Sequence, residues 1–256
     1  MKSISVIIFL FSHLAFADSE IPTCSPSCST GQICIRKEKD KPAVCEMPPV
    51  MAPLKNLILP FDSKEEVYCT HSSGSGSHSW TNAFYALDLA NSYDKPASTI
   101  LAAADGKAFV FLGEDGKLCP EPAGNPQKAD TNACGSSWGN HIKILHDGGY
   151  YTFYVHLDRV LIANGSMVKK GQPIGIEGWT GAAGHRHLHW SVQKLPGATS
   201  SDWEKRISWA GESVPFQFQA YVNGNLQTVD TSSFQCAHAG IGQAAKGQQP
   251  ILKRSP

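Results

Sequence analysis

The sequence predicts an all-β protein in which one β-rich domain follows a small disulfide-rich segment. Asp-Gly steps at 105–106, 115–116 and 147–148 separate short runs rich in Val, Ile, Phe and Tyr, which is typical of strands joined by hairpin turns. Long helical periodicity is absent from the sequence. Eight cysteines, an even number, favour disulfides, with four of them close together near the N-terminus.

The first 17 residues have the pattern of a secretory signal peptide. Met1 and Lys2 precede an apolar run over residues 6–11, and residues 15–17 are Ala-Phe-Ala, a cleavage pattern. The apolar run is too short to span a bilayer. We therefore expect an exported protein, periplasmic or secreted, with no stable membrane insertion.

The charge balance limits the classes of partner. The chain has 22 Lys and Arg against 22 Asp and Glu, and charged residues are 17% of the total. This composition is typical of a globular protein rather than a disordered one. A neutral chain also lacks the positive field of an electrostatic nucleic-acid binder, so we expect no nucleic-acid partner.

Residues 18–49 predict a small Cys-rich module that ends in a Pro-rich linker, Met47-Pro48-Pro49. Its cysteines lack the paired C-x2-C spacing of zinc ribbons, and exported thiols tend to oxidise, so disulfides are favoured over a metal site. Three pairings of these four cysteines are possible. The cysteines are Cys24, Cys28, Cys34 and Cys45.

The main domain is expected over residues 50–236. The runs 108–112 and 141–145 predict paired strands, and 150–156 is a third β-prone run. Residues 201–207 predict one short helix, with a serine at the start as a candidate cap.

The remaining cysteines predict two further bridges. Cys119 and Cys134 flank a loop rich in Pro, Asn and Asp, which a disulfide would staple. Cys69 and Cys236 are then left to tie the start of the domain to its end. Residues 237–256 are rich in Gly, Ala, Gln and Lys, so we expect a flexible C-terminal tail.

The pair His187 and His189 is the sharpest local signal for chemistry. Side chains two residues apart on a strand share a face, so both imidazoles would point into one space. One ring could bind a metal while the other acts as an acid or base. The alternative is that each is an ordinary polar strand residue.

Asp88 lies inside the apolar run 84–90 and needs a cation, a metal or a hydrogen-bond network, because an unpaired buried carboxylate is costly. A turn-capping role is the structural alternative. His78 and His71 precede it, and His156 ends the Tyr-rich run. Three His or Asp ligands with one open position make a catalytic zinc site, and additional histidines favour proton transfer.

Several ordered blocks of sequence resemble the lysostaphin-type M23 zinc endopeptidases. The order and spacing of the blocks match throughout. They are residues 102–108, 139–157, 168–175, 180–181 and 187–190. The resemblance implies an antiparallel β-sheet, barrel- or sandwich-like domain with a groove, a single zinc ion and hydrolysis of peptide bonds in peptidoglycan.

Site residues follow from the resemblance position by position. Asp88 and His189 are implied as zinc ligands, and His156 and His187 as catalytic imidazoles. The resemblance departs at the first ligand, where Phe84 stands in place of a histidine four residues before the aspartate. His78 fits a longer His-to-Asp spacing, with His71 as the open alternative, and we favour His78 because longer loops cost more entropy.

Arg186 is a second departure, at a position where the family commonly has proline. We expect it to alter substrate contacts.

The sequence therefore predicts an exported, monomeric endopeptidase that uses one zinc ion to cut peptide stems or cross-links of bacterial peptidoglycan. Zinc would lower the pKa of a bound water toward about 7, and two histidines would move protons. The alternative is a catalytically inactive M23-like domain that binds cell wall or regulates an amidase. Phe84, at the position of a ligand, favours this alternative, whereas the presence of Asp88, His156, His187 and His189 disfavours it.

Overall fold

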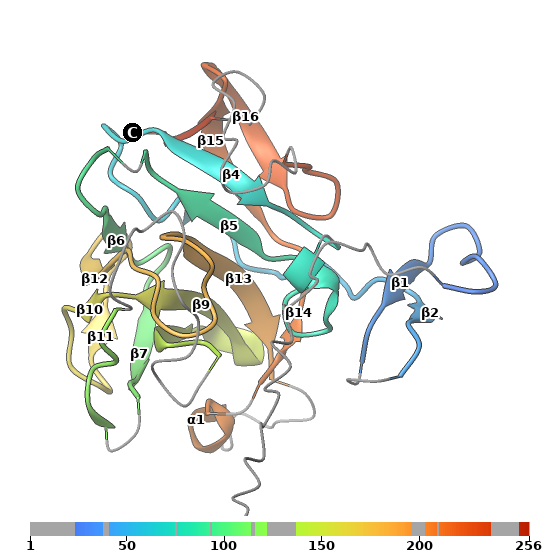
Figure 1. Cartoon of the computed structure of the whole chain (residues 1–256), viewed down its shortest axis with the longest axis horizontal. Helices are drawn as coiled ribbons and strands as arrows, with labels where there is room; N and C mark the ends of the chain where they lie inside the picture. Colours follow the sequence, from blue (N-terminus) through green and yellow to red (C-terminus); the bar gives the residue numbers. More distant parts are fainter. Residues whose placement is uncertain are drawn as a thin grey trace, which may run out of the picture.

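The structure is a computed structural model of the whole chain (Figure 1). The predicted signal peptide lies outside the residues that it describes. Within the described residues, no helix has the length and apolar character needed to cross a membrane. The described residues are 24–37, 41–74, 76–92, 94–113, 116–121, 137–195, 203–208, 210–236 and 251–255.

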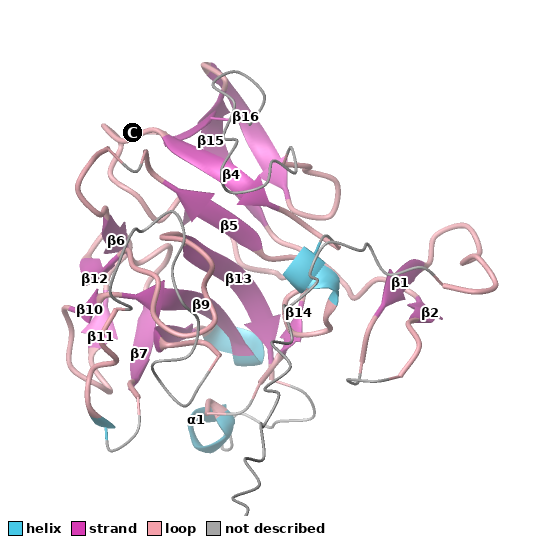
Figure 2. Ribbon diagram, viewed as in Figure 1, coloured by secondary structure: helices cyan, strands magenta, loops and turns pink. Residues whose placement is uncertain are grey.

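One large, curled sheet dominates the described part of the chain, which confirms the all-β prediction (Figure 2). Its strands run in the order β11-β7-β8-β9-β13-β5-β4-β17-β15-β16, with β14 beside β13 and β3 beside β15. Every pair is antiparallel except β3 with β15. The strands are β3 (Leu57–Ile58), β4 (Val67–His71), β5 (Leu87–Ala90), β7 (Gly106–Phe111), β8 (Asn140–Leu145), β9 (Tyr150–Leu157), β11 (Met167–Val168), β13 (Leu188–Lys194), β14 (Glu212–Ser213), β15 (Gln217–Val222), β16 (Asn225–Asp230) and β17 (Ile251–Arg254).

A second, three-stranded sheet covers part of one face of the large sheet. It consists of β10 (Arg159–Val160), β12 (Pro173–Ile176) and β6 (Thr99–Leu101). Ile100 and Ile174 from this sheet belong to the same buried cluster as Tyr154 and Trp190 from β9 and β13. The opposite face of β9 carries a separate cluster that includes Phe153. Strand β9 is therefore buried on both faces, which explains its nearly continuous apolar run.

The predicted strands are confirmed as β7, β8 and β9, and β7 pairs with β8. The turn at Asp147–Gly149 joins the β8–β9 hairpin. The expected hairpin at residues 105–106 is wrong, because β6 pairs with β12 while β7 pairs with β8 and β11. There the Asp105 carboxylate accepts the backbone N–H of Lys170 at 2.8 Å, which directs the chain toward the residues before β12.

The prediction of a flexible tail is wrong for Ile251–Arg254. These residues form β17, which fits between β4 and β15. Leu252 is fully buried there. The composition of residues 237–256 did not indicate this strand, because the segment has few apolar residues. Pairing with the edges of β4 and β15, together with the burial of one leucine, holds it in place.

The short helix predicted at 201–207 is present as α1 (Trp203–Arg206). Its predicted cap, Ser201, lies outside the described residues. Cys69 pairs with Cys236 as predicted. Cys119 is also disulfide-bonded, and its expected partner, Cys134, lies outside the described residues.

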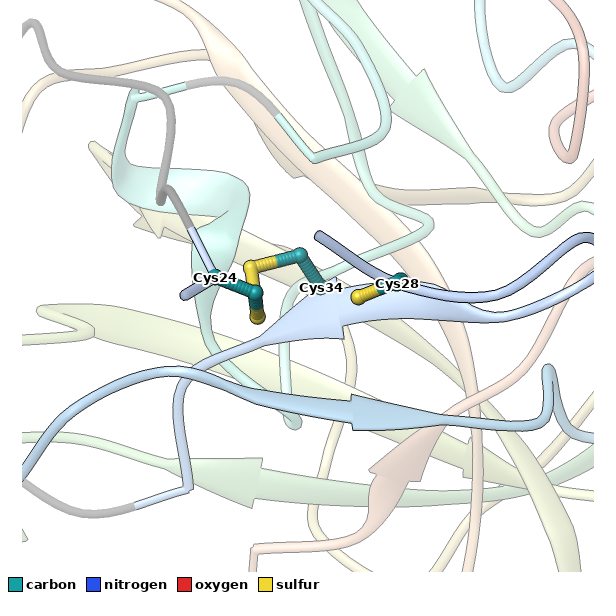
Figure 3. A group of neighbouring side chains, drawn as sticks. All are labelled: Cys24, Cys28 and Cys34. Carbon is teal, nitrogen blue, oxygen red and sulfur yellow. A yellow bond between two sulfur atoms is a disulfide. The ribbon is translucent and has the colours of Figure 1, made fainter. Parts of the chain in front are cut away.

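The N-terminal Cys-rich segment forms a two-stranded sheet of β1 (Ile33–Ile35) and β2 (Val44–Glu46). Of the three possible pairings, the structure has Cys24–Cys34 and Cys28–Cys45. Three of these sulfur atoms lie within 4.8 Å of one another beside β1 (Figure 3). Because each belongs to a disulfide, none is a thiolate that could bind a metal.

Candidate metal centre and active site

The candidate site begins where β5 and β13 lie side by side. Asp88 stands directly opposite His189 in the register of these antiparallel strands. The His189 Nδ1 atom lies 3.0 Å from Asp88 Oδ1. Opposed residues on paired strands share a face, so the pairing itself brings the two side chains together.

His78 reaches the same carboxylate oxygen from a short helical turn, η1 (Gly76–Ser79), between β4 and β5. Its Nε2 atom lies 3.1 Å from Asp88 Oδ1, and the side chain is 0% exposed. Its Nδ1–H donates to the carbonyl oxygen of Ser72 at 3.2 Å, which orients the ring with Nε2 toward the aspartate.

His71, the alternative first ligand, approaches the other oxygen of the aspartate. Its Nδ1 atom lies 3.6 Å from Asp88 Oδ2, and the side chain is 25% exposed. A one-residue irregularity in the β4–β5 pairing, between Cys69 and His71, turns it toward the site. His71 is therefore close to the aspartate but does not converge on the oxygen shared by His78 and His189.

The three side chains fit a metal ion. Ligand atoms of His78, Asp88 and His189 all lie within 4.8 Å of one another, and all three residues are buried. Two donors on one tetrahedral zinc lie about 3.3 Å apart, close to the observed nitrogen-to-oxygen distances, and a set of two imidazoles and one carboxylate is a common zinc set. The Nε2 atom of His189 is buried without a hydrogen-bond partner among the described residues. A cation held by the Nδ1 atom of His189 and the Asp88 carboxylate would offset the cost of burying that carboxylate.

His156 is aimed into the site by a distortion of β9. The β8–β9 register shifts by one residue between Asn140 and Ile142, and His156 has a φ of +66°, unusual for a residue with a side chain. Its Nδ1–H donates to the carbonyl oxygen of Thr180 at 2.8 Å. A β-carbon on Gly139 would lie 2.4 Å from the Thr180 backbone, so glycine is needed for this approach.

His187 faces His156 across the site, with 4.8 Å between the ring centroids. Its Nδ1–H donates to the carbonyl oxygen of His185 at 2.9 Å, and its Nε2 atom lies 3.7 Å from Asp88 Oδ1. His187 and His189 thus both reach Asp88, as expected from their spacing of two. His185 itself stacks on His187 at 4.4 Å between centroids.

Burial and charge set the protonation of the cluster. Burial opposes ionisation of Asp88, but the neighbouring imidazoles of His78, His187 and His189 hold its pKa well below the usual range. Burial lowers the pKa of both His156 and His187 to about 3. Both rings are therefore neutral at physiological pH, and each can accept a proton.

Aromatic rings continue from the site into the neighbouring hydrophobic cluster. The Trp138 ring lies 5.8 Å from that of His189 and 5.2 Å from that of Phe153. A cavity of about 230 Å³ continues from there, with Lys143 and Gln193 among its polar lining residues.

Sequence reasoning missed Trp138 and His185 as parts of the site, and it included Thr180 in a matching block without giving it a role. Thr180 and His185 act through backbone carbonyl oxygens, which no side-chain pattern encodes. Trp138 could have been suspected from its position, because it directly precedes the matching block that begins at residue 139. Arg186 has a buried guanidinium that donates to Asn91 Oδ1 at 2.6 Å and to the carbonyl oxygens of Ser92 and Lys95, and the expected effect on substrate contacts stays a prediction.

Residues 84–202 match the family model described as peptidase family M23. The chain contains an M23 peptidase domain. Asp88, His156, His187 and His189 lie inside the matched part of the domain, and His78 lies before it.

Relatives of the M23 domain include peptidoglycan DD-endopeptidase ShyB of Vibrio cholerae, 44% identical over 54 residues, which are 21% of this chain and 13% of that protein. An uncharacterized metalloprotease of Haemophilus influenzae is 33% identical over 106 residues, 37% of this chain and 22% of that protein. The chain thus spans less than a quarter of the length of either relative. A solved structure of the M23 metalloprotease pseudoalterin is 18% identical, with a TM-score of 0.38 over 56% of this chain and 72% of that one.

Proposed function

We propose that this protein is an exported, zinc-dependent endopeptidase that hydrolyses peptide cross-links or stems of bacterial peptidoglycan. The observation that carries the proposal is the buried cluster of His78, Asp88 and His189, faced by two more histidines. The M23 domain and a relative named as a peptidoglycan DD-endopeptidase support the substrate class. The signal-peptide pattern of residues 1–17 supports export.

His78, Asp88 and His189 would hold the zinc ion. When bound, zinc supplies an activated water near neutral pH and polarises the scissile carbonyl. The carboxylate of Asp88 is fully ionised, because the surrounding imidazoles keep its pKa low, and so it is ready to bind a cation. His71, on the other oxygen, would orient the carboxylate rather than bind the metal.

His156 and His187 would transfer the protons. Each ring donates its Nδ1–H to a backbone carbonyl, so Nε2 is the nitrogen left for catalysis. Neutral rings with lowered pKa can accept a proton, then return it to the leaving amine or donate a hydrogen bond to the oxyanion. Acid–base work of this kind contributes about 10²- to 10⁴-fold in rate.

We further propose that catalysis belongs to the domain that starts near residue 50 and includes the C-terminal strand β17, while residues 18–49 hold no catalytic group. The protein would act as a monomer, since β5, β13 and the η1 turn of a single chain supply all three ligands.

The test measures zinc and hydrolysis together. Disulfide-intact residues 18–256 are analysed for metal content and incubated with purified peptidoglycan sacculi, as wild type, His78→Ala and His71→Ala. We expect one zinc per chain and release of soluble peptides in the wild type, loss of both in His78→Ala, and retained zinc in His71→Ala. A wild type that binds sacculi without zinc and without hydrolysis would contradict the proposal and favour the inactive, wall-binding alternative.

A further inference from the structure

The N-terminal Cys-rich segment makes backbone hydrogen bonds to the end of the turn that carries His78 and to the residues just after it. Arg36, the residue after β1, pairs in parallel with Trp80. The Arg36 N–H donates to the carbonyl oxygen of Ser79 at 3.0 Å, and the Thr81 N–H donates to the carbonyl oxygen of Arg36 at 3.1 Å. In effect, the end of β1 adds a short strand to the residues that follow η1, and Figure 1 shows β1 beside this part of the chain.

Side-chain packing reinforces the contact. Ile35 is 5% exposed and lies in a small buried cluster with Phe84 and Tyr85, against which Ile33 also packs. Among the described residues, this cluster joins two parts of the chain, the β1 strand and the segment between β4 and β5. Phe84 is the residue that replaces a histidine in the resemblance noted above, and its ring faces Tyr85 at 5.0 Å between centroids.

We propose that the disulfide-rich segment acts as a brace that positions His78, so that metal affinity depends on residues 33–36. Ile35 and the backbone of Arg36 are the positioning groups. The inference rests on the proposed function, since it takes His78 to be a metal ligand.

The physical reason is the weakness of the turn by itself. The η1 helix has four residues, and a helix this short is not stable without outside contacts. A ligand that must be ordered at the moment of binding reduces affinity by the free energy of ordering it. On the domain side, Ser213 supports the same segment through a hydrogen bond from the Tyr85 N–H to its hydroxyl at 3.0 Å. The β1 strand supplies the support on the other side, immediately next to His78.

The two disulfides explain how such a small segment can serve as a brace. Cys34 lies between the two isoleucines of β1 and is bridged to Cys24, and Cys45 in β2 is bridged to Cys28. A segment of this size buries too little apolar surface to fold without cross-links. The bridges thus fix the strand that contacts the η1 turn.

The test compares Ile35→Ala with Val44→Ala by zinc affinity. Ile35 and Val44 are cross-strand partners in the same small sheet, but Val44 is 40% exposed and lies outside the cluster. The dissociation constant for zinc is measured on disulfide-intact residues 18–256 by competition with a chromophoric chelator. We expect it to rise about tenfold or more in Ile35→Ala, equivalent to about 1.4 kcal/mol, and less than about twofold in Val44→Ala.

A second variant loosens the brace without touching its contact surface. Replacing Cys28 and Cys45 together by serine should also raise the zinc dissociation constant, and hydrogen exchange at the amide of Thr81 should accelerate in both variants. Near-ultraviolet circular dichroism reports whether the main core is intact, so that loss of metal affinity is separated from general unfolding. If Ile35→Ala does not fold, Ile35→Val provides the graded comparison.

The outcomes separate this inference from the proposed function. If the wild type binds zinc and Ile35→Ala binds it equally tightly, the brace is refuted and the metal centre stands. If the folded wild type binds no zinc, the metal centre is refuted and the inference falls with it. Equal weakening in Ile35→Ala and Val44→Ala would also overturn the inference, because the effect would then not depend on the contact with the η1 turn.

Discussion

Replacing Asn140 with alanine removes a side chain that ties the start of β8 to two other segments. Its Oδ1 accepts the Cys119 N–H at 2.9 Å, and its Nδ2 donates to the carbonyl oxygens of Cys119 and Leu157, both at 3.0 Å. In the variant, the Leu157 carbonyl oxygen still accepts a hydrogen bond from the Thr180 hydroxyl at 2.8 Å. The main loss is therefore at Cys119, whose backbone N–H and carbonyl oxygen both lose their hydrogen bonds to Asn140. A buried group that loses its partner costs about 1–3 kcal/mol, so we expect the free energy of unfolding to fall by about 3 kcal/mol.

Urea unfolding followed by tryptophan fluorescence measures this loss on the disulfide-intact chain. Asn225→Ala is the matched control, because Asn225 is exposed on β16 and its side chain makes a long bond, 3.4 Å to the carbonyl oxygen of Asn223. Its cost should stay below about 0.5 kcal/mol. A loss below about 1 kcal/mol for Asn140→Ala, or equal losses in the two variants, would refute the reasoning from buried hydrogen bonds.

Three further predictions concern stability. Burial lowers the pKa of His141 to about 4, so the unfolded ring takes up a proton between about pH 6.5 and 4 while the folded ring does not. The chain should lose on the order of 3 kcal/mol over that range, and urea unfolding of His141→Phe should show this part of the loss removed; an unchanged acid slope would contradict it. Burial lowers the pKa of Lys143 to about 8, so the folded state binds fewer protons than the unfolded state above that pH. Stability should therefore rise between about pH 8 and 10.5, and Lys143→Met should lack this rise in the same assay. The Cys69–Cys236 bridge spans 167 residues, and serine at both positions should cost up to about 5 kcal/mol by chain entropy, measured against the wild type without reductant. A change below about 1 kcal/mol would indicate that the unfolded chain is already restricted.

Much of the fold could be predicted because β-strand signals are local. The run at 150–156 is β-prone whatever its neighbours, and the Asp-Gly-Gly turn before it fixes the hairpin with β8. The strand β17 was missed because its order comes from the edges of β4 and β15, which are distant in sequence. Long-range pairing of this kind leaves little trace in composition.

The candidate site likewise has some features that local sequence predicts and others that it does not. The period of two along a strand placed His187 and His189 on one face, and the apolar run around Asp88 indicated a buried charge that needs a partner. The bulge that turns His156 into the site is a register shift between two strands, which one strand's sequence does not encode. Glu177 is a buried carboxylate that local sequence does not reveal: glycines lie on either side of it, yet the side chain is fully buried and accepts the Ser98 N–H at 3.2 Å.

The departure at Phe84 has a physical explanation in the fold. The Phe84 carbonyl accepts the N–H of Gly74, and its ring packs with Ile35, so its side chain belongs to the contact with the disulfide-rich segment. In the proposed metal centre the first ligand would therefore come from elsewhere, and His78, on a separate turn ten residues before Asp88, lies within 3.1 Å of that carboxylate. A ligand on a longer loop costs more entropy to order than one anchored next to β5. Contacts that hold the loop before the metal arrives reduce that cost, and the ring of Phe84 provides one of them.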